Sequence, residues 1–198
     1  MKTIKPELTG TTETMLQSFY ARAMYSKNNV FKDKKAEEIV DLIDYDFSKA
    51  KKDGTMHSGV IARSIVLDEL VSDYIQKYPD CVVVNIACGL DTRFYRVDNG
   101  KILWYNLDLP EVIKLRNSLF KDTQRVFNLS FNVLDEKWTK QVKKSIHMVF
   151  IIEGLTMYMT KEQVESMLQI IYGAFDHAYI CMETLCPYFV KKERMEKS

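Results

Sequence analysis

Three acidic side chains directly follow apolar segments, where they could bind polar groups of a ligand. Asp108 follows the segment 102–107, Asp135 follows 125–134, and Glu153 follows 146–152. A carboxylate accepts hydrogen bonds from hydroxyl, amide and ammonium groups. The ligands of an open α/β sheet bind beyond the carboxyl ends of its strands, so these residues are the first candidates for function.

Asp108 also has the spacing of a nucleoside-binding acid. An earlier apolar segment, 81–87, ends in Ala87-Cys88-Gly89, where small residues let the backbone approach a ligand. Asp108 lies nineteen residues beyond Gly89 and is followed by Leu109 and Pro110. In nucleoside-binding folds, an acid at this distance accepts a hydrogen bond from the ribose. Its alternative role is to cap the helix expected to begin at Pro110.

The other two acids extend the same interpretation. Asp135 could accept a hydrogen bond from an adenine amino group while Leu134 packs against the ring, or it could simply cap a helix over 136–144. Glu153 ends a strand expected at the centre of the sheet, near the amino-acid half of a nucleoside–amino acid cofactor. A carboxylate beside a buried strand needs a partner or solvent, so packing alone does not explain Glu153.

The segments that carry these acids alternate with helical patterns. Short runs rich in Val and Ile cover 81–87, 102–107, 125–134, 146–152 and 178–183, and helices are expected over 91–98, 110–121, 136–144 and 161–175. The last helix should begin with a capping box formed by Thr160 and Gln163. This alternation predicts an α/β fold, with a mostly parallel sheet and helices on both faces.

Residues before the first strand form a helical region without strand candidates. Apolar residues recur at helical spacing from residue 12, and a third helix is expected to follow Gly59 and end at Tyr78-Pro79. Its apolar face is predicted to contain Ile61, Ile65, Leu70, Val71 and Ile75, with Leu67 out of register. We expect an N-terminal helical cap over 1–78 and an α/β core over 79–198, within one domain overall.

Composition narrows the class of partner. The 198 residues are 46% hydrophobic and 12% aromatic, which suits a sizeable core, and the net charge of +1 gives no field that would attract nucleic acid or an anionic membrane. The four cysteines form no CxxC pair and no zinc-ligand cluster, which favours a reducing compartment and no metal. Without an apolar run of about 18 residues or a signal-like N-terminus, the expected location is cytoplasmic, with no membrane partner.

Several motifs resemble the leucine carboxyl methyltransferase-like family, which includes bacterial O-methyltransferases of polyketide pathways. The resemblance covers most of the chain and rests on Arg22-Ala23, on the segment from Gly59 to Asp68, and on residues 85–96, 104–113 and 153–158. It implies a Rossmann-like class I methyltransferase fold that binds S-adenosyl-L-methionine across the first four strand ends.

The resemblance also implies roles for individual residues. Arg63 matches an arginine that pairs with the cofactor carboxylate, for which a planar guanidinium is well suited. Asp108 would bind the ribose, Asp135 would lie near adenine, and Glu153 would lie near the methionine amine. The full set of expected cofactor-binding residues is Arg63, Ala87, Gly89, Asp108, Leu109, Leu134, Asp135 and Glu153.

This sequence departs from the family pattern at two places. Ala87 stands where family members commonly have glycine, so the turn could shift slightly. Family members also continue beyond a fifth strand with an antiparallel hairpin and a substrate-covering segment, whereas this chain ends at Ser198. The C-terminal strands of the family are thus expected to be missing, and three explanations stay open: the chain is a fragment, residues are absent from the sequence, or the acceptor site is incomplete.

The expected activity is transfer of a methyl group to a hydroxyl or carboxylate of a small molecule, within EC class 2.1.1. Such a transfer is an in-line displacement that depends mainly on positioning and exclusion of water, and a general base is optional. His57 and Tyr158 are weak candidates for the acceptor side, so the catalytic residues are left open.

Two alternatives compete with a methyltransferase. An NAD-dependent oxidoreductase would share the acid of the second strand but should carry a Gly-x-Gly-x-x-Gly turn, of which only Gly89 is present. A truncated, non-catalytic cofactor-binding module would act through protein contacts. In that case the fifth strand would lie near an exposed edge, which favours pairing with another chain and makes a homodimer an open expectation.

Overall fold

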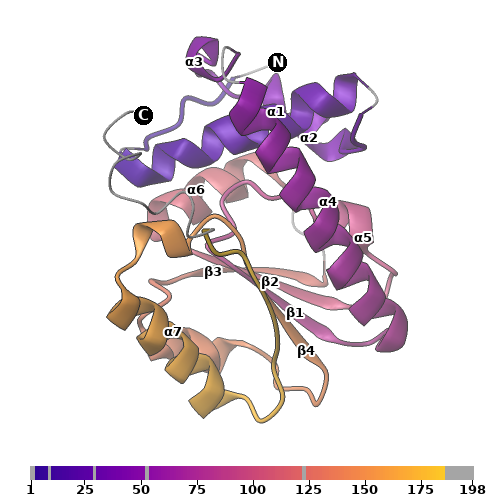
Figure 1. Cartoon of the computed structure of the whole chain (residues 1–198), viewed down its shortest axis with the longest axis vertical. Coiled ribbons are helices and arrows are strands. Elements are labelled where there is room, and N and C mark those ends of the chain that lie inside the picture. The colour runs from indigo at the N-terminus through magenta and orange to yellow at the C-terminus, as the bar shows by residue number, and fades with distance from the viewer. Residues whose placement is uncertain (1–2, 9, 29, 52–53, 122–123, 186–198) are drawn as a thin grey trace.

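The computed structural model describes residues 3–8, 10–28, 30–51, 54–121 and 124–185. Its centre is a parallel sheet in the order β3-β2-β1-β4-β5 (Figure 1). The strands are β1 (Val82–Ile86), β2 (Leu103–Asp108), β3 (Val126–Ser130), β4 (Met148–Ile152) and β5 (Tyr179–Met182). All five predicted strands are therefore present, and the predicted α/β fold is confirmed. Residues 186–198, which include Cys186, lie outside the described residues, so the expectation for the C-terminal end of the chain is not tested there.

The central strands are apolar along their length because both of their faces are covered, as is usual for parallel strands. On one face, Val84, Phe150 and Tyr105 belong to a cluster that includes Trp138 and Met167 from the covering helices. A second cluster on the other face includes further residues of β1, β2, β4 and β5. The sheet is therefore the middle layer of three.

The order of the strands creates a crevice beside β1. This strand pairs with β2 on one side and with β4 on the other. The chain adds β2 and β3 on one side of β1, then crosses over and adds β4 and β5 on the other side. Ligands of open α/β sheets bind beyond the carboxyl ends of the strands at such a reversal. The ends of β1, β2 and β4 are the ends that carry Gly89, Asp108 and Glu153.

Helices cover the sheet as predicted. Residues of α4 (Gly54–Lys77) and α5 (Phe94–Val97) pack on one face, and residues of η2 (Glu136–Gln141) and α7 (Lys161–Ala174) pack on the other. Helix α6 (Pro110–Leu119) contacts β2 and β3. Helix α7 begins with the predicted capping box of Thr160 and Gln163, which is confirmed.

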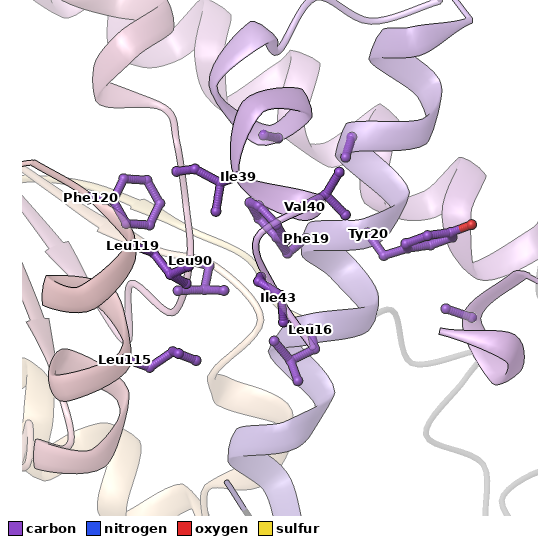
Figure 2. Packing of buried hydrophobic residues seen from close by; sticks show 13 residues of the cluster. Leu16, Phe19, Tyr20, Ile39, Val40, Ile43, Leu90, Leu115, Leu119 and Phe120 are labelled. Carbon is purple, nitrogen blue, oxygen red and sulfur yellow. The ribbon is translucent and has the colours of Figure 1, made fainter. Parts of the chain in front are cut away.

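The remaining N-terminal helices gather at one end of the molecule (Figure 1). They are η1 (Gly10–Glu13), α1 (Thr14–Lys27), α2 (Lys34–Val40) and α3 (Ser48–Lys51). Leu16 and Phe19 of α1 share a buried cluster with Leu90, which follows β1, and with Leu115 of α6 (Figure 2). This apolar contact holds α1 against the loop that contains Gly89. Within the described residues, no helix is long and apolar enough to span a membrane.

Helix α4 corrects two expectations. It begins at Gly54 rather than after Gly59, and Leu67, which seemed out of register, is only 6% exposed. Ile65 and Leu70, predicted to lie on the apolar face, are 38% and 39% exposed. The buried face instead passes through Leu67 and Val71, four residues apart, which is the helical spacing of a single face.

The two kinds of position on α4 should respond differently to truncation. We expect Leu67→Ala to lower the free energy of unfolding by about 2–5 kcal/mol, because it leaves a cavity in the core. The matched change Ile65→Ala should cost less than about 1 kcal/mol, since that side chain is partly in solvent. Denaturation with urea measures both losses of unfolding free energy. Equal losses would show that Ile65 belongs to the buried face of α4, as first predicted.

Candidate functional site

A cavity of about 500 Å³ opens at the carboxyl ends of the strands. It is bounded by the residues that follow β1, β2, β3 and β4 and by side chains of α1 and α4. Its volume falls within the range of small-molecule sites, roughly 300–1,000 Å³. Of the residues predicted from sequence, those that line it are Arg63, Ala87, Gly89, Asp108, Leu109, Leu134, Glu153 and Tyr158.

The turn after β1 needs left-handed backbone at two residues. Ala87 has φ 51° and Gly89 has φ 49°. This conformation costs an alanine about 1–2 kcal/mol but costs glycine nothing, so the glycine that the family commonly has in place of Ala87 would be less strained there. A Cβ atom on Gly89 would lie 3.2 Å from the side chain of Met15, which would have to shift by a few tenths of an ångström, and the left-handed backbone would strain any other residue there.

Asp108 is tied to this turn. One of its carboxylate oxygens accepts a hydrogen bond of 2.7 Å from the backbone N–H of Gly89, and the other accepts one of 2.7 Å from the N–H of Leu109. It does not cap α6, whose N-cap is Leu109 and has no side-chain bond. Burial raises the pKa of the Asp108 carboxyl, while the two N–H donors act in the opposite direction. The unused lone pairs of Asp108 can accept hydrogen bonds from a ligand.

Asp135 occupies a different environment. Its side chain accepts a hydrogen bond of 3.1 Å from the N–H of Lys137, which makes it the N-cap of η2, and it is not among the residues that line the cavity. The alternative role as a helix cap is therefore the one the structure shows. The expected contact between Asp135 and adenine has no support in this geometry, whereas Leu134 and Phe131 do line the cavity.

Glu153 lies between two arginines. One carboxylate oxygen accepts a hydrogen bond of 2.9 Å from Nε of Arg63, and the other accepts one of 2.7 Å from Nη2 of Arg93. Burial alone would raise the pKa of Glu153, but the positive charges of Arg93, Arg22 and Arg63 outweigh it and hold the pKa below its ordinary value. Glu153 is thus ionised at neutral pH, as a partner for an ammonium group must be.

Arg63 projects from α4 to the same end of the cavity. Besides Glu153, it donates to Oε1 of Glu183 at 3.2 Å and to Oγ of Ser18 at 3.4 Å. Three of the five N–H donors of its guanidinium are engaged by these contacts, which leaves one donor on Nη1 and one on Nη2. Arg63 can therefore keep its protein partners and still bind an anionic group.

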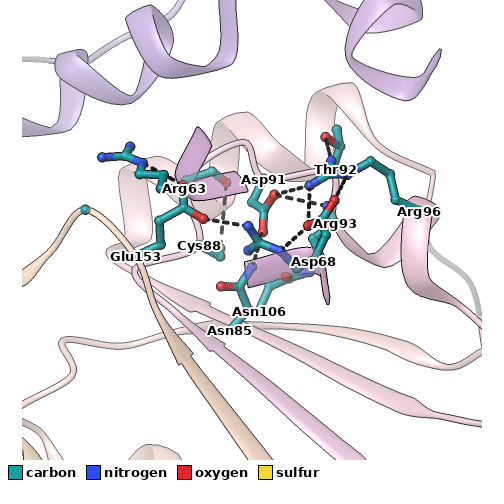
Figure 3. Close-up of polar contacts among 12 residues, drawn as sticks. Arg63, Asp68, Asn85, Cys88, Asp91, Thr92, Arg93, Arg96, Asn106 and Glu153 are labelled. Carbon is teal, nitrogen blue, oxygen red and sulfur yellow. Dashed lines mark hydrogen bonds and ion pairs between the residues drawn. The ribbon is translucent and has the colours of Figure 1, made fainter. Parts of the chain in front are cut away.

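Behind Glu153 lies a network of buried charges (Figure 3). Arg93, only 1% exposed, donates to Asp68, Asp91 and Glu153 at 2.6–2.9 Å. Arg96 continues the network from Asp68. Because each buried charge has an oppositely charged partner, the network fixes Glu153 without leaving a carboxylate unpaired.

Sequence reasoning assigned no role to two residues at this end: Arg22, which lines the cavity, and Glu183, which contacts the lining residues Arg63 and Gly154. Arg22 of α1 is 5% exposed and lines the cavity; its Nε has no hydrogen bond within the described chain, and Asp33 lies 3.8 Å away. Glu183 directly follows β5 and contacts Arg63. The rule that found the other acids, a carboxylate directly after an apolar strand, applies equally to Glu183 and would have found it.

The two acceptor-side candidates differ in their placement. His57 lies in α4 rather than in a loop, is buried against the rings of Tyr20 and Tyr25, and does not line the cavity. This placement corrects the suggestion that it acts on an acceptor. Tyr158 lines the cavity, is 50% exposed, and has its hydroxyl 3.2 Å from Oγ1 of Thr14.

The site thus has two parts. Asp108, at the end of β2, lies beside the turn that contains Gly89, and an ion-pair cluster around Glu153 lies at the end of β4. The first can accept hydrogen bonds from vicinal hydroxyls, and the second can bind a zwitterion through Glu153 and Arg63. Within the described ranges, no group of three or more His, Cys, Asp or Glu residues could hold a metal ion.

Comparison with known proteins gives matches over most of the chain. The family model of leucine carboxyl methyltransferase matches residues 9–172. The tetracenomycin polyketide synthesis O-methyltransferase TcmP of Streptomyces glaucescens is 31% identical over 187 residues, which are 93% of this chain and 69% of that protein. The S-adenosyl-L-methionine-dependent methyltransferase dpfgK of Gibberella zeae is 30% identical over 190 residues, 86% of this chain and 63% of that protein. The chain spans about two thirds of the length of these curated relatives.

Among solved structures, the plantazolicin methyltransferase BamL in complex with a substrate analogue and SAH is 16% identical and has a TM-score of 0.46, covering 83% of this chain and 56% of that one. A complex of DhpI is 17% identical with a TM-score of 0.45, covering 96% of this chain and 72% of that one. The family match and the sequence relatives, together with the parallel sheet, carry the assignment: the chain belongs to the leucine carboxyl methyltransferase family of S-adenosyl-L-methionine-dependent methyltransferases.

Proposed function

We propose that this chain binds S-adenosyl-L-methionine in the cavity at the strand ends and methylates an oxygen atom of a small molecule. The observation that carries the proposal is the placement of Asp108, Glu153 and Arg63 around one cavity in a member of this family. Each group has free hydrogen-bonding capacity or charge that matches one part of the cofactor.

The cofactor would lie across the ends of β1, β2 and β4. Asp108 would accept hydrogen bonds from the ribose hydroxyls, and the side chains of Leu134 and Phe131 would contact the adenine ring. At the other end, Glu153 would bind the α-ammonium group and the free donors of Arg63 would bind the α-carboxylate. The backbone of Ala87 and Gly89 would approach the middle of the cofactor, and Gly89 would leave this approach free of a side chain.

The rest of the cavity suits an apolar acceptor. Its lining also contains the side chains of Met15, Met56, Val60, Met157 and Tyr158. One relative of this chain is named for polyketide synthesis, which supports a small aromatic or polyketide-like acceptor. The flexible thioether side chains of methionine adapt to irregular apolar surfaces, which suits such an acceptor.

Catalysis would rest on positioning. When bound, the cofactor supplies a methyl group on a sulfonium, which an acceptor oxygen can take by in-line displacement. The protein's part is to hold the two reacting atoms in line and to keep water out, and effective molarities for such alignment are large. A carboxylate acceptor is already ionised at neutral pH and would need no base.

Calorimetric titration tests the proposal on the chain as it stands. We expect S-adenosyl-L-methionine and S-adenosylhomocysteine to bind and NAD not to bind, because the turn after β1 lacks the close glycines that a pyrophosphate needs. A panel of phenols and carboxylic acids, assayed for methyl incorporation, then identifies the acceptor class. If neither sulfur nucleoside binds, the proposal is wrong. If both bind but no acceptor is methylated, the chain is a non-catalytic cofactor-binding module.

A further inference from the structure

The carboxylate of Glu183 joins the two residues proposed to hold the amino-acid half of the cofactor. We call Arg63 and Glu153 the amino-acid clamp. Oε1 of Glu183 accepts a hydrogen bond of 3.2 Å from Nη1 of Arg63. Its Oε2 accepts one of 2.7 Å from the backbone N–H of Gly154, the residue next to Glu153. One side chain therefore contacts one clamp residue directly and the other through its neighbour.

Glu183 is itself held in place by the sheet. Its N–H donates to the carbonyl of Ile152 at 2.9 Å, and its own carbonyl accepts a hydrogen bond of 2.9 Å from Oγ1 of Thr156. These contacts attach Glu183 both to the last residue of β4 and to the turn that follows it. The carboxylate is thus presented from a rigid base, which is what a positioning group requires.

Both groups that Glu183 contacts have conformational freedom to lose. The Arg63 side chain is 24% exposed, and an arginine side chain carries about 2 kcal/mol of rotamer entropy. Gly154 has φ 67°, in the left-handed region, and it lacks a side chain that would restrict it. Without Glu183, a ligand would have to order both groups on binding, and the cost would appear as lower affinity.

Glu183 also leaves the clamp open to a ligand. It uses one donor of Nη1, and Ser18 uses one of Nη2 at 3.4 Å, so within the described residues each of these two nitrogens keeps one donor for a ligand. Two parallel donors form the fork that binds a carboxylate in a bidentate manner. The direct Arg63–Glu153 contact can lengthen when an ammonium group binds Glu153, because Glu183 still holds Arg63.

We propose that Glu183 is a positioning residue that sets the geometry of the amino-acid clamp before the cofactor binds. The inference rests on the proposed function, since it assigns Glu183 to the amino-acid end of the same cavity. It concerns only ligands that carry the α-amino and α-carboxylate groups. A ligand made of the nucleoside half alone should be indifferent to Glu183.

Two ligands separate positioning from a general structural role. S-adenosylhomocysteine contains the amino-acid half, and 5′-methylthioadenosine lacks it. We expect Glu183→Gln to weaken S-adenosylhomocysteine about tenfold, the scale of one lost charge-assisted hydrogen bond. Binding of 5′-methylthioadenosine should change by less than about twofold. Glu183→Asp, which keeps the charge but is too short to reach both partners, should show the same selectivity if the amide variant does not fold.

Glu165→Gln is the matched control, because Glu165 lies on the exposed side of α7 in an ion pair with Lys161. It should leave both affinities unchanged. A thermodynamic cycle adds an independent test: in an Arg63→Met background, the Glu183→Gln change should weaken S-adenosylhomocysteine less than it does alone, because only the contact with Gly154 remains to be lost.

The outcomes are distinct. Equal weakening of both ligands by the Glu183 variants would show a structural role only and overturn the inference, as would unchanged or tighter binding of S-adenosylhomocysteine. Full additivity with Arg63→Met would overturn it too. Failure of the unaltered protein to bind either ligand would instead refute the proposed function.

Discussion

Replacement of Asp108 by alanine should weaken S-adenosylhomocysteine and 5′-methylthioadenosine alike, by at least about 100-fold. Asp108 is the acid that ends β2 and borders the cavity, with one oxygen bonded to the N–H of Gly89 and the other to the N–H of Leu109. Hydrogen bonds to a charged group contribute about 1.5–3 kcal/mol each, and two ribose hydroxyls would lose theirs. The change also leaves the N–H of Gly89 without its acceptor, which loosens the turn. Calorimetry with the two ligands measures the effect.

Asp135→Ala provides the matched control. The residue type and the substitution are the same, and Asp135 also follows a strand, but its side chain caps η2 outside the cavity. We expect its affinity for both ligands to be unchanged and the free energy of unfolding to fall by about 1 kcal/mol, the usual cost of a lost cap. If Asp135→Ala weakened both ligands as much as Asp108→Ala, Asp135 would contact the cofactor after all. If Asp108→Ala left both affinities unchanged, Asp108 would not bind the ribose.

The sheet could be predicted because its signal is local. Parallel strands covered on both faces are continuous apolar runs, so β1 and β4 stand out in the sequence by composition alone. The long α4 was harder, because the face it buries depends on what it packs against. Leu67 was placed out of register by a pattern that included Ile65 and Leu70, two residues that are partly in solvent. Apolar type does not establish burial, since apolar atoms also make up much of a protein's surface.

The site could be predicted in outline but not in its contacts. The ends of parallel strands meet at one edge of the sheet, so the acids after β2 and β4 could be placed beside one cavity without a structure. Asp135 seemed to obey the same rule, but β3 ends at Ser130, and five residues later the Asp135 side chain accepts a hydrogen bond from the N–H of Lys137 instead. The partners of Glu153 come from α4 and from the turn after β1, so they depend on how distant segments pack.

Arg93 shows what the sequence could not indicate at all. It appeared only as part of a family motif, yet it is the centre of the buried charge network and contacts Asp68, Asp91 and Glu153. We expect Arg93→Met, which keeps much of the side-chain volume, to lower the free energy of unfolding by about 3–5 kcal/mol at pH 7. Removal of Arg93 leaves three carboxylates buried with less positive charge beside them, although Arg63 still contacts Glu153 and Arg96 still contacts Asp68, and breaking a buried ion pair costs more than the pair itself contributes.

The effect of Arg93→Met should depend on pH, and its direction follows from the carboxylates. In the unaltered protein, burial opposes ionisation of Asp91 and Glu153, but the charges of Arg93 and its neighbours hold both pKa values below their ordinary range. Their stabilisation is complete above the unfolded-state pKa of about 4 and is lost as the pH falls through the lower folded pKa. Without Arg93 the folded pKa values of both carboxyls rise, so the variant gains less stability than the unaltered protein as the pH increases.

The difference in unfolding free energy between the two proteins should therefore be largest at pH 7 and shrink toward pH 4.5. Urea is the suitable denaturant, because the ions of guanidinium chloride would screen the charges. Arg125→Met is the control: Arg125 pairs with Asp98 near the surface, with side chains 29% and 23% exposed, and its loss should cost less than about 1 kcal/mol with little pH dependence. If Arg93→Met costs no more than this control, or costs the same at both pH values, the network does not stabilise the site through paired charges.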